Sequence, residues 1–133
     1  MTEFFADTSG LVAYLSAEDK YHEAAHEYLV DLADRIVTTP WVLCELGNFL
    51  ASRTKRRSFV AFLRDLRRDT RVDVLPLDAK LYENGLALYA RRLDKEWSVT
   101  DCISFVAMKH QRLTDALTAD HHFEQAGFRA LLG

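Results

Sequence analysis

The chain has 133 residues, 49% of them hydrophobic, which predicts a single α/β domain over residues 1–133 whose core needs no crosslinks. Two cysteines are too few for a disulfide framework, and no apolar run approaches the roughly 20 residues of a membrane span, so we expect a cytoplasmic protein with no membrane partner. A formal net charge of −3 argues against a tight, unspecific DNA-binding protein, although bound cations would change the local charge.

The N-terminal half alternates short β-rich runs with helical patterns. Pro40 suits the first turn of a helix, and the apolar residues that follow it keep helical spacing, including Phe49. The expected elements are a strand at 4–6, a turn at 7–10, a helix over 21–32, a strand at 36–39, a helix from 40 to 50, and a further helix over 59–66.

The C-terminal half continues the alternation. Asp78 can cap a helix whose inward face would hold Leu81, Tyr82, Tyr89 and Leu93. The expected elements are a strand at 72–75, this helix from 78 to 93, a helix over 100–110, and strands at 116–118 and 128–132. Short strands alternating with helices favour a mainly parallel sheet covered on both faces.

Four acidic residues take related places in this frame. Asp7 follows the first predicted strand and Asp120 the fourth, and ligands of open parallel sheets gather beyond the carboxyl ends of the strands. Asp101 stands in the first turn of a helix. Glu45 lies on the Pro40 helix, away from its apolar stripe, where it can face across to the others. We therefore expect these acids to converge.

Each acid also has an ordinary structural interpretation. Asp7 can form an Asx-turn or cap a helix, and Asp120 can cap the segment after it. Ser98 and Asp101 approximate a capping box, with Asp in place of the usual Glu. Glu45 can be a solvated helix residue. The hypothesis of a site depends on the joint placement of the four, not on any one of them.

Clustered carboxylates raise each other's pKa unless a cation compensates their charge. A pocket of acids therefore implies a hard divalent cation, Mg²⁺ or Mn²⁺, with oxygen ligands. Such an ion activates a water and stabilises negative charge on a phosphodiester. The hydroxyls of Thr8, Ser9 and Thr118 can hold ligands or waters in place, although ordinary turn and strand hydrogen bonds are an equal alternative.

These segments resemble a known family. The sequences Asp7-Thr8-Ser9, Ser98-Val99-Thr100-Asp101-Cys102-Ile103-Ser104-Phe105 and Leu117-Thr118-Ala119-Asp120-His121-His122-Phe123, with Glu45 in a helix, are similar to PIN-domain nucleases. Among these the chain is most similar to VapC-like toxins of toxin–antitoxin pairs. The resemblance covers nearly the whole chain and is most specific in its last third. Cys102 departs from the commonest pattern, which has a small apolar residue there.

The resemblance implies a three-layer α/β/α domain with strand order 3-2-1-4-5. It also implies an endoribonuclease whose acidic pocket binds Mg²⁺ or Mn²⁺ and cleaves single-stranded or loop RNA. The four acidic positions of the family match Asp7, Glu45, Asp101 and Asp120, so nothing indicates an inactive relative. VapC-like proteins commonly form homodimers and are silenced by a small antitoxin protein, and we expect both here.

A basic stretch follows the Pro40 helix. We interpret Arg53, Arg57 and Arg64 as contacts for the RNA backbone or the antitoxin, on one helical face with Arg68 and Arg71. A solvated surface is the alternative.

Three further interpretations stay open. The acids can belong to a catalytically silent binding module that holds a basic partner segment. His121 and His122 lack the further ligands of a zinc site. Trp41 and Trp97 flank the acidic segments, where packing is favoured over base stacking.

Overall fold

A computed structural model describes residues 1–133 and contains one five-stranded sheet, all of whose strands pair in parallel. The strand order is β3-β2-β1-β4-β5, as the resemblance implied. The strands are β1 (Glu3–Ala6), β2 (Arg35–Thr38), β3 (Val72–Val74), β4 (Asp115–Leu117) and β5 (Arg129–Ala130). Phe5 at the centre pairs with Val37 on one side and Ala116 on the other, so the first and fourth strands are direct neighbours.

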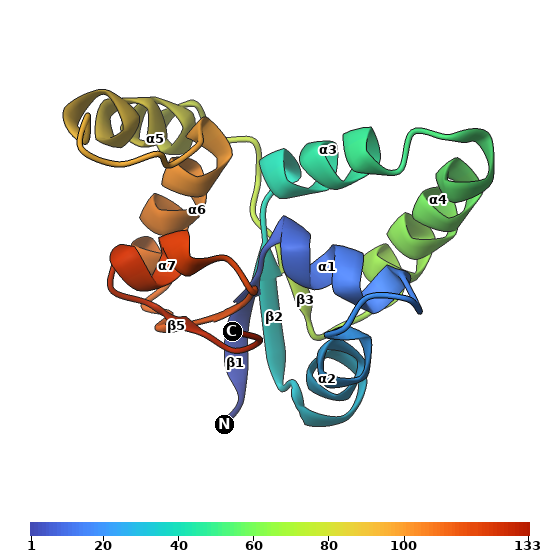
Figure 1. The fold of residues 1–133 in the computed structure, drawn as a ribbon. Helices are drawn as coiled ribbons and strands as arrows, with labels where there is room; N and C mark the ends of the chain where they lie inside the picture. Colours follow the sequence, from blue (N-terminus) through green and yellow to red (C-terminus); the bar gives the residue numbers. More distant parts are fainter.

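Helices cover both faces of the sheet. In Figure 1, α5, α6 and α7 lie on one side and α1 to α4 on the other, which gives three layers. The helices are α1 (Thr8–Leu15), α2 (His22–His26), the π-helical η1 (Glu27–Leu32), α3 (Pro40–Phe49), α4 (Arg53–Arg68), α5 (Ala79–Arg91), α6 (Val99–His110) and α7 (His121–Gln125). None of them combines the length and the apolarity that crossing a bilayer requires.

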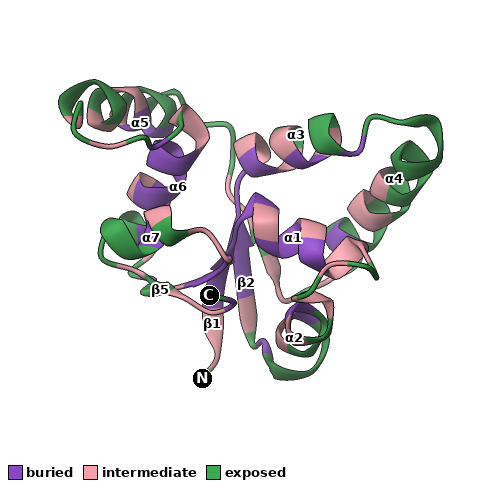
Figure 2. Ribbon diagram, viewed as in Figure 1, coloured by how far each residue is buried: buried purple, intermediate pink, exposed green.

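The core follows the central strands. Phe4, Phe5 and Ala6 are fully buried, as expected for a strand with helices on both faces, and they belong to a continuous cluster of 25 buried apolar residues. Figure 2 shows burial concentrated in β1, β2 and α6, whereas most of α4 and α5 is exposed or half-buried. The acidic candidates lie where this core reaches the carboxyl ends of β1 and β4.

The predicted turn at 7–10 is wrong, because the chain enters helix α1 directly at Thr8. Thr8, Ser9 and Gly10 have turn chemistry in isolation, but a tertiary contact decides their conformation. A Cβ at residue 10 would collide with the carbonyl oxygen of Leu117, so glycine lets α1 pack tightly on β4. The short helix α7, which begins directly after Asp120, was indicated only by the alternative interpretation of Asp120 as a cap.

Several element boundaries differ from the expected ones. The predicted helix over 21–32 is divided into α2 and η1. The last strand, expected over 128–132, covers two residues only, since the chain leaves the sheet after Ala130. The further helix expected over 59–66 begins earlier, at Arg53, and ends at Arg68.

Some apolar side chains that were expected to face inward are exposed. Phe49 on α3 is 61% exposed, and Leu93, which lies beyond the end of α5, is 90% exposed. Tyr82 and Tyr89 are also exposed, because α5 packs on α6 through Leu81 and Gly85. Of the two free cysteines, Cys102 is buried and Cys44 is exposed.

Candidate active site

Asp7 is a buried carboxylate held by two hydroxyl groups. It occupies the N-terminal cap position of α1, yet its side chain makes no capping hydrogen bond. Instead, the hydroxyl group of Thr118 donates to Asp7 Oδ2 at 2.9 Å, and Ser9 Oγ, which also contacts Thr118, lies 3.4 Å from the same oxygen. Only 4% of the residue is exposed. The capping interpretation therefore does not account for its side chain.

The surroundings of Asp7 disfavour its ionised form. Burial is the largest cause and raises its pKa to about 7, although the hydrogen bond from Thr118 opposes the shift. The negative charges of Asp101 and Glu45 raise it further. No basic side chain forms an ion pair with Asp7. A buried carboxylate beside two other acids, with no cation from the protein, is the electrostatic signature of a cation site.

Asp101 combines a structural role with membership of this cluster. The capping box predicted at the start of α6 is present. The backbone N–H of Asp101 donates to Ser98 Oγ at 3.0 Å, and the backbone N–H of Ser98 donates to Asp101 Oδ2 at 3.1 Å. Burial raises the pKa of Asp101, the Ser98 N–H lowers it, and the Asp120 carboxylate raises it again. The cap fixes one oxygen of this carboxylate and leaves it beside the other acids.

Asp120 caps α7, as its alternative interpretation proposed. Its Oδ1 accepts from the backbone N–H of His122 at 2.9 Å. Its own backbone N–H donates to Thr118 Oγ1 at 3.0 Å, and the same hydroxyl donates to Asp7. One threonine side chain thus connects the ends of β1 and β4 and fixes the main chain at Asp120 relative to the carboxylate of Asp7.

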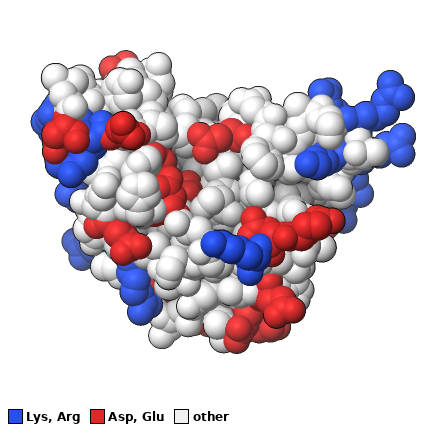
Figure 3. Space-filling model, viewed as in Figure 1, with Lys and Arg blue, Asp and Glu red and all other residues white.

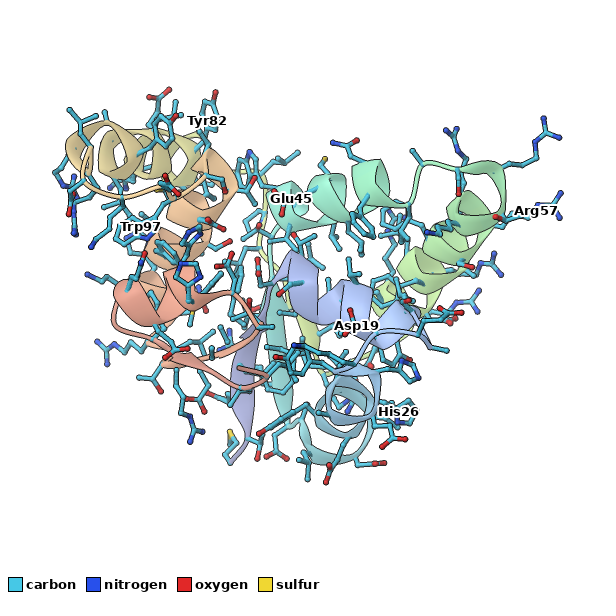
Figure 4. The ribbon with its side chains drawn as sticks, in the orientation of Figure 1. Asp19, His26, Glu45, Arg57, Tyr82 and Trp97 are labelled. Carbon is cyan, nitrogen blue, oxygen red and sulfur yellow. The ribbon has the colours of Figure 1, made fainter.

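Glu45 reaches the cluster from α3. It lies where α3 approaches α1 and α6 (Figure 4), and its charge is one of those that raise the pKa of Asp7. Its side chain is half-buried and has no hydrogen-bond or ion-pair partner within the protein. Figure 3 shows acidic side chains between α3 and the α6–α7 side, while basic ones gather over α4. All four predicted acids therefore meet at one end of the sheet.

Three of the acids share an arrangement that fits a divalent cation. The hydrogen bonds to Asp7 and Asp101 go to Oδ2, and those to Asp120 go to Oδ1. The second oxygen of each carboxylate makes no hydrogen bond within the protein. These free oxygens, together with the Glu45 carboxylate, are oxygen ligands that could hold a divalent cation.

The three predicted hydroxyl residues differ in what they contact. Ser9 and Thr118 hydrogen bond each other at 2.8 Å and both contact Asp7. The backbone N–H of Ala119 also donates to Ser9, which extends the network along the loop after β4. Thr8 Oγ1 is buried without a hydrogen-bond partner, so its side chain is not part of the network.

The basic stretch lies apart from the acids. Arg53, Arg57 and Arg64 are exposed on α4, and Figure 4 shows Arg57 pointing outward from the end of the molecule. The expectation that Arg71 shares their helical face is wrong, because α4 ends at Arg68. Arg71 instead forms an ion pair with Asp69 at 2.8 Å and donates to the carbonyl oxygen of Ala33, which ties the start of β3 to the end of η1.

Sequence reasoning gave little weight to His122, which contacts the acidic cluster. Its Nδ1 lies 3.2 Å from Asp101 Oδ2 and 3.3 Å from Asp120 Oδ1. The sequence signal that could have found it is its spacing from Asp120. A side chain two residues after a capping residue remains near the carboxylate of that cap. Trp97 packs on Phe105 and donates to Gln125, as favoured from the sequence, and Trp41 stacks on Tyr82.

A parallel sheet of this order, with four acids from β1, α3, α6 and β4 at one end, defines a class of metal-dependent nuclease domains. The family model of the PIN domain matches residues 4–129, which is nearly the whole chain. The chain therefore belongs to the PIN domain family.

Its relatives include VapC ribonucleases of Mycobacterium tuberculosis. The chain is 31% identical over 124 residues to the 23S rRNA-specific endonuclease VapC20, with 93% of this chain and 94% of that protein covered. It is 29% identical over 118 residues to ribonuclease VapC26, with 88% and 87% covered.

Solved structures agree with this assignment. The crystal structure of Mycobacterium tuberculosis VapC20, a sarcin-ricin loop cleaving toxin, superposes with a TM-score of 0.85 at 30% identity and covers 96% of both chains. VapBC2 from Rickettsia felis, with a TM-score of 0.68 at 14% identity and 97% of both chains covered, shares the fold.

Proposed function

We propose that this protein is a metal-dependent endoribonuclease and the toxin of a toxin–antitoxin pair, with residues 1–133 as one nuclease domain. The observation that carries the proposal is the buried Asp7 carboxylate. It lies beside Asp101 and Glu45, has its pKa raised to about 7, and has no basic partner. A protein gains nothing from this arrangement unless a cation binds there.

Asp7, Glu45, Asp101 and Asp120 would hold Mg²⁺ or Mn²⁺. The bound ion would supply charge stabilisation at the scissile phosphate and activate the attacking water. The protein's own part is orientation: Thr118 and Ser9 fix Asp7, the capping box fixes Asp101, and the start of α7 fixes Asp120. Glu45, which no protein donor holds, can adjust as the phosphodiester enters.

The substrate and partners follow from the relatives and from the charge distribution. VapC20 is a 23S rRNA-specific endonuclease, and we assign RNA as the substrate here as well. We therefore expect the activity in the cytoplasm. A cognate antitoxin and a homodimer are the partners we expect. The seven cationic residues of α4, against one acid, suit contact with the RNA backbone or with an acidic antitoxin segment.

The decisive experiment maps new 5′ ends in total RNA after brief expression of the wild type and of Asp7→Asn. We expect discrete cleavage sites with the wild type and none with the variant. The purified wild type should also gain thermal stability with manganese, because only the folded site binds the ion. Wild-type cleavage that persists undiminished in EDTA would contradict the metal-dependent assignment.

A silent binding module is the second candidate, and the unpaired acids permit it, because a basic peptide segment could neutralise them. The two candidates differ in their response to manganese. A binding module predicts no manganese-dependent stabilisation and no new RNA ends, yet retains affinity for a basic peptide. Manganese binding together with Asp7-dependent cleavage excludes it.

A further inference from the structure

His122 is the one side chain that contacts two of the clustered carboxylates. Its Nδ1 lies 3.2 Å from Asp101 Oδ2 and 3.3 Å from Asp120 Oδ1. Its side chain is 20% exposed, and the neighbouring Phe123 is fully buried, with its ring edge-on to Phe105 of α6 at 4.9 Å. The packing of Phe123 therefore holds α7 against α6 and keeps the imidazole between the two acids.

The contacts also define which nitrogen carries the proton. Carboxylate oxygens accept hydrogen bonds, so a ring nitrogen between two of them must be the donor, Nδ1–H. This N–H donates to Asp101 Oδ2, and Asp120 Oδ1 lies within ion-pair distance of the same nitrogen. The two acids come from different elements and repel each other. No other side chain connects them. Both contacts use the oxygens that already accept from the backbone of Ser98 and of His122, so the opposite oxygens keep no protein donor.

We propose that His122 is a positioning residue: its ring Nδ1–H donates to Asp101, the same nitrogen lies between Asp101 and Asp120, and this bridge fixes the orientation of both carboxylates toward the divalent cation. The inference rests on the proposed function, since it assumes that these acids bind the ion. Removing the bridge should leave the fold intact, because the buried Phe123 anchors α7 independently. It should weaken cation binding, because two carboxylates that can rotate and separate are no longer organised before the ion arrives.

The test compares four variants of the full chain by calorimetric titration with manganese alone. His122→Leu removes the donor and should raise the manganese Kd by about 10–100-fold, the usual effect of losing a group that orients a ligand. His122→Asn places an amide N–H near the Nδ1 position and should recover most of the affinity. His122→Gln, whose amide lies nearer the Nε2 position, should not. His110→Leu is the matched control, because that ring is exposed in the last turn of α6 and contacts none of the acids.

Each outcome decides the proposal. An unchanged Kd for His122→Leu overturns it and leaves the proposed function intact, provided that the wild type binds manganese and Asp101→Asn does not. No binding by the wild type overturns both. A bridge at Nδ1 is also rejected if the asparagine and glutamine variants lose manganese affinity equally. It is rejected as well if the control variant loses as much manganese affinity as His122→Leu. Circular dichroism monitors whether each variant is folded. If His122→Leu is unfolded, the difference in manganese Kd between His122→Asn and His122→Gln still decides whether Nδ1–H forms the bridge.

Discussion

Helices α6 and α4 show how differently two parts of this molecule are built. Seven of the twelve residues of α6 are buried, including Asp101, whereas Leu66 alone is buried among the sixteen of α4. Gly85 lets α5 pack closely on α6, and Phe123 packs on it from α7. By contrast, α4 exposes seven cationic side chains, none of which forms an ion pair.

The difference corresponds to two kinds of task. Carboxylates that bind a cation must keep fixed positions, which requires a rigid and buried support. A charged surface that meets a flexible polyanion or a partner protein needs exposure and tolerates movement. We therefore expect changes around α6 to affect catalysis and stability, and changes of the charged side chains on α4 to affect mainly the encounter with RNA or a partner protein.

The largest effect is expected at Asp101. Asp101→Asn should keep the capping hydrogen bond, because the amide oxygen still accepts from Ser98, but it removes one negative charge from the cation site. Loss of several kcal/mol of transition-state stabilisation corresponds to a roughly 1,000-fold lower cleavage rate. Gel-based cleavage of RNA at fixed manganese measures it. Asp73→Asn, at an exposed ion pair with Arg35, is the control that should remain active. An active Asp101→Asn would refute the assignment.

A pair of truncations compares the packing of the two helices directly. Ile103→Ala on α6 removes a fully buried side chain and should lower the free energy of unfolding by about 3 kcal/mol. Leu63→Ala on α4 removes a half-buried one and should cost about 1 kcal/mol. Urea unfolding at one pH gives both values. Equal losses would mean that α4 is as firmly packed as α6.

The pH dependence of stability probes the buried acid. The folded pKa of Asp7 is about 7, above its unfolded value of 3.8, so the folded state binds more protons between these pH values. Without metal, the free energy of unfolding should therefore fall by about 2–4 kcal/mol as pH rises from 4 to 7. Urea unfolding in EDTA across this range measures the decline.

Two controls isolate the contribution of Asp7. The variant Asp7→Asn removes the titrating group, so its decline over the same range should be smaller. Manganese at about 100 times its Kd should add about 2.7 kcal/mol at pH 7. A wild-type profile parallel to that of Asp7→Asn would show that Asp7 titrates normally.

The smallest effect is expected on α4. Reversing the charge of Arg57 and Arg64 together should weaken RNA binding about tenfold and lower the salt dependence by about one unit per lost phosphate contact. Stability should change by less than about 0.5 kcal/mol, since both side chains are exposed. Reversal of the exposed Lys109, in the last turn of α6, and of the exposed Arg112, just after that helix, is the matched control. Equal effects of the two pairs would make α4 an ordinary solvated surface.

Local patterns were enough to predict much of this protein. The apolar run Phe4–Ala6, the proline at the start of α3 and the Ser98–Asp101 capping box are encoded by adjacent residues, and the structure has all three. The positions of Asp7 and Asp120 after the first and fourth strands followed from the same reasoning, whereas the strand order that makes these strands neighbours was implied by the family resemblance. Their convergence could be anticipated because the carboxyl ends of parallel strands share one edge of the sheet.

What the sequence by itself determined is the alternation of strands and helices over most of the chain and the places of the four acids along it, because periodicity and capping act over a few residues. Only the tertiary structure decided that residues 8–10 form a helix, that Asp7 is buried, and that His122 lies between two carboxylates. These features depend on contacts such as that between Ser9 and Thr118, which lie 109 positions apart in the sequence. Burial and close approach come from packing of distant segments, which no local pattern specifies.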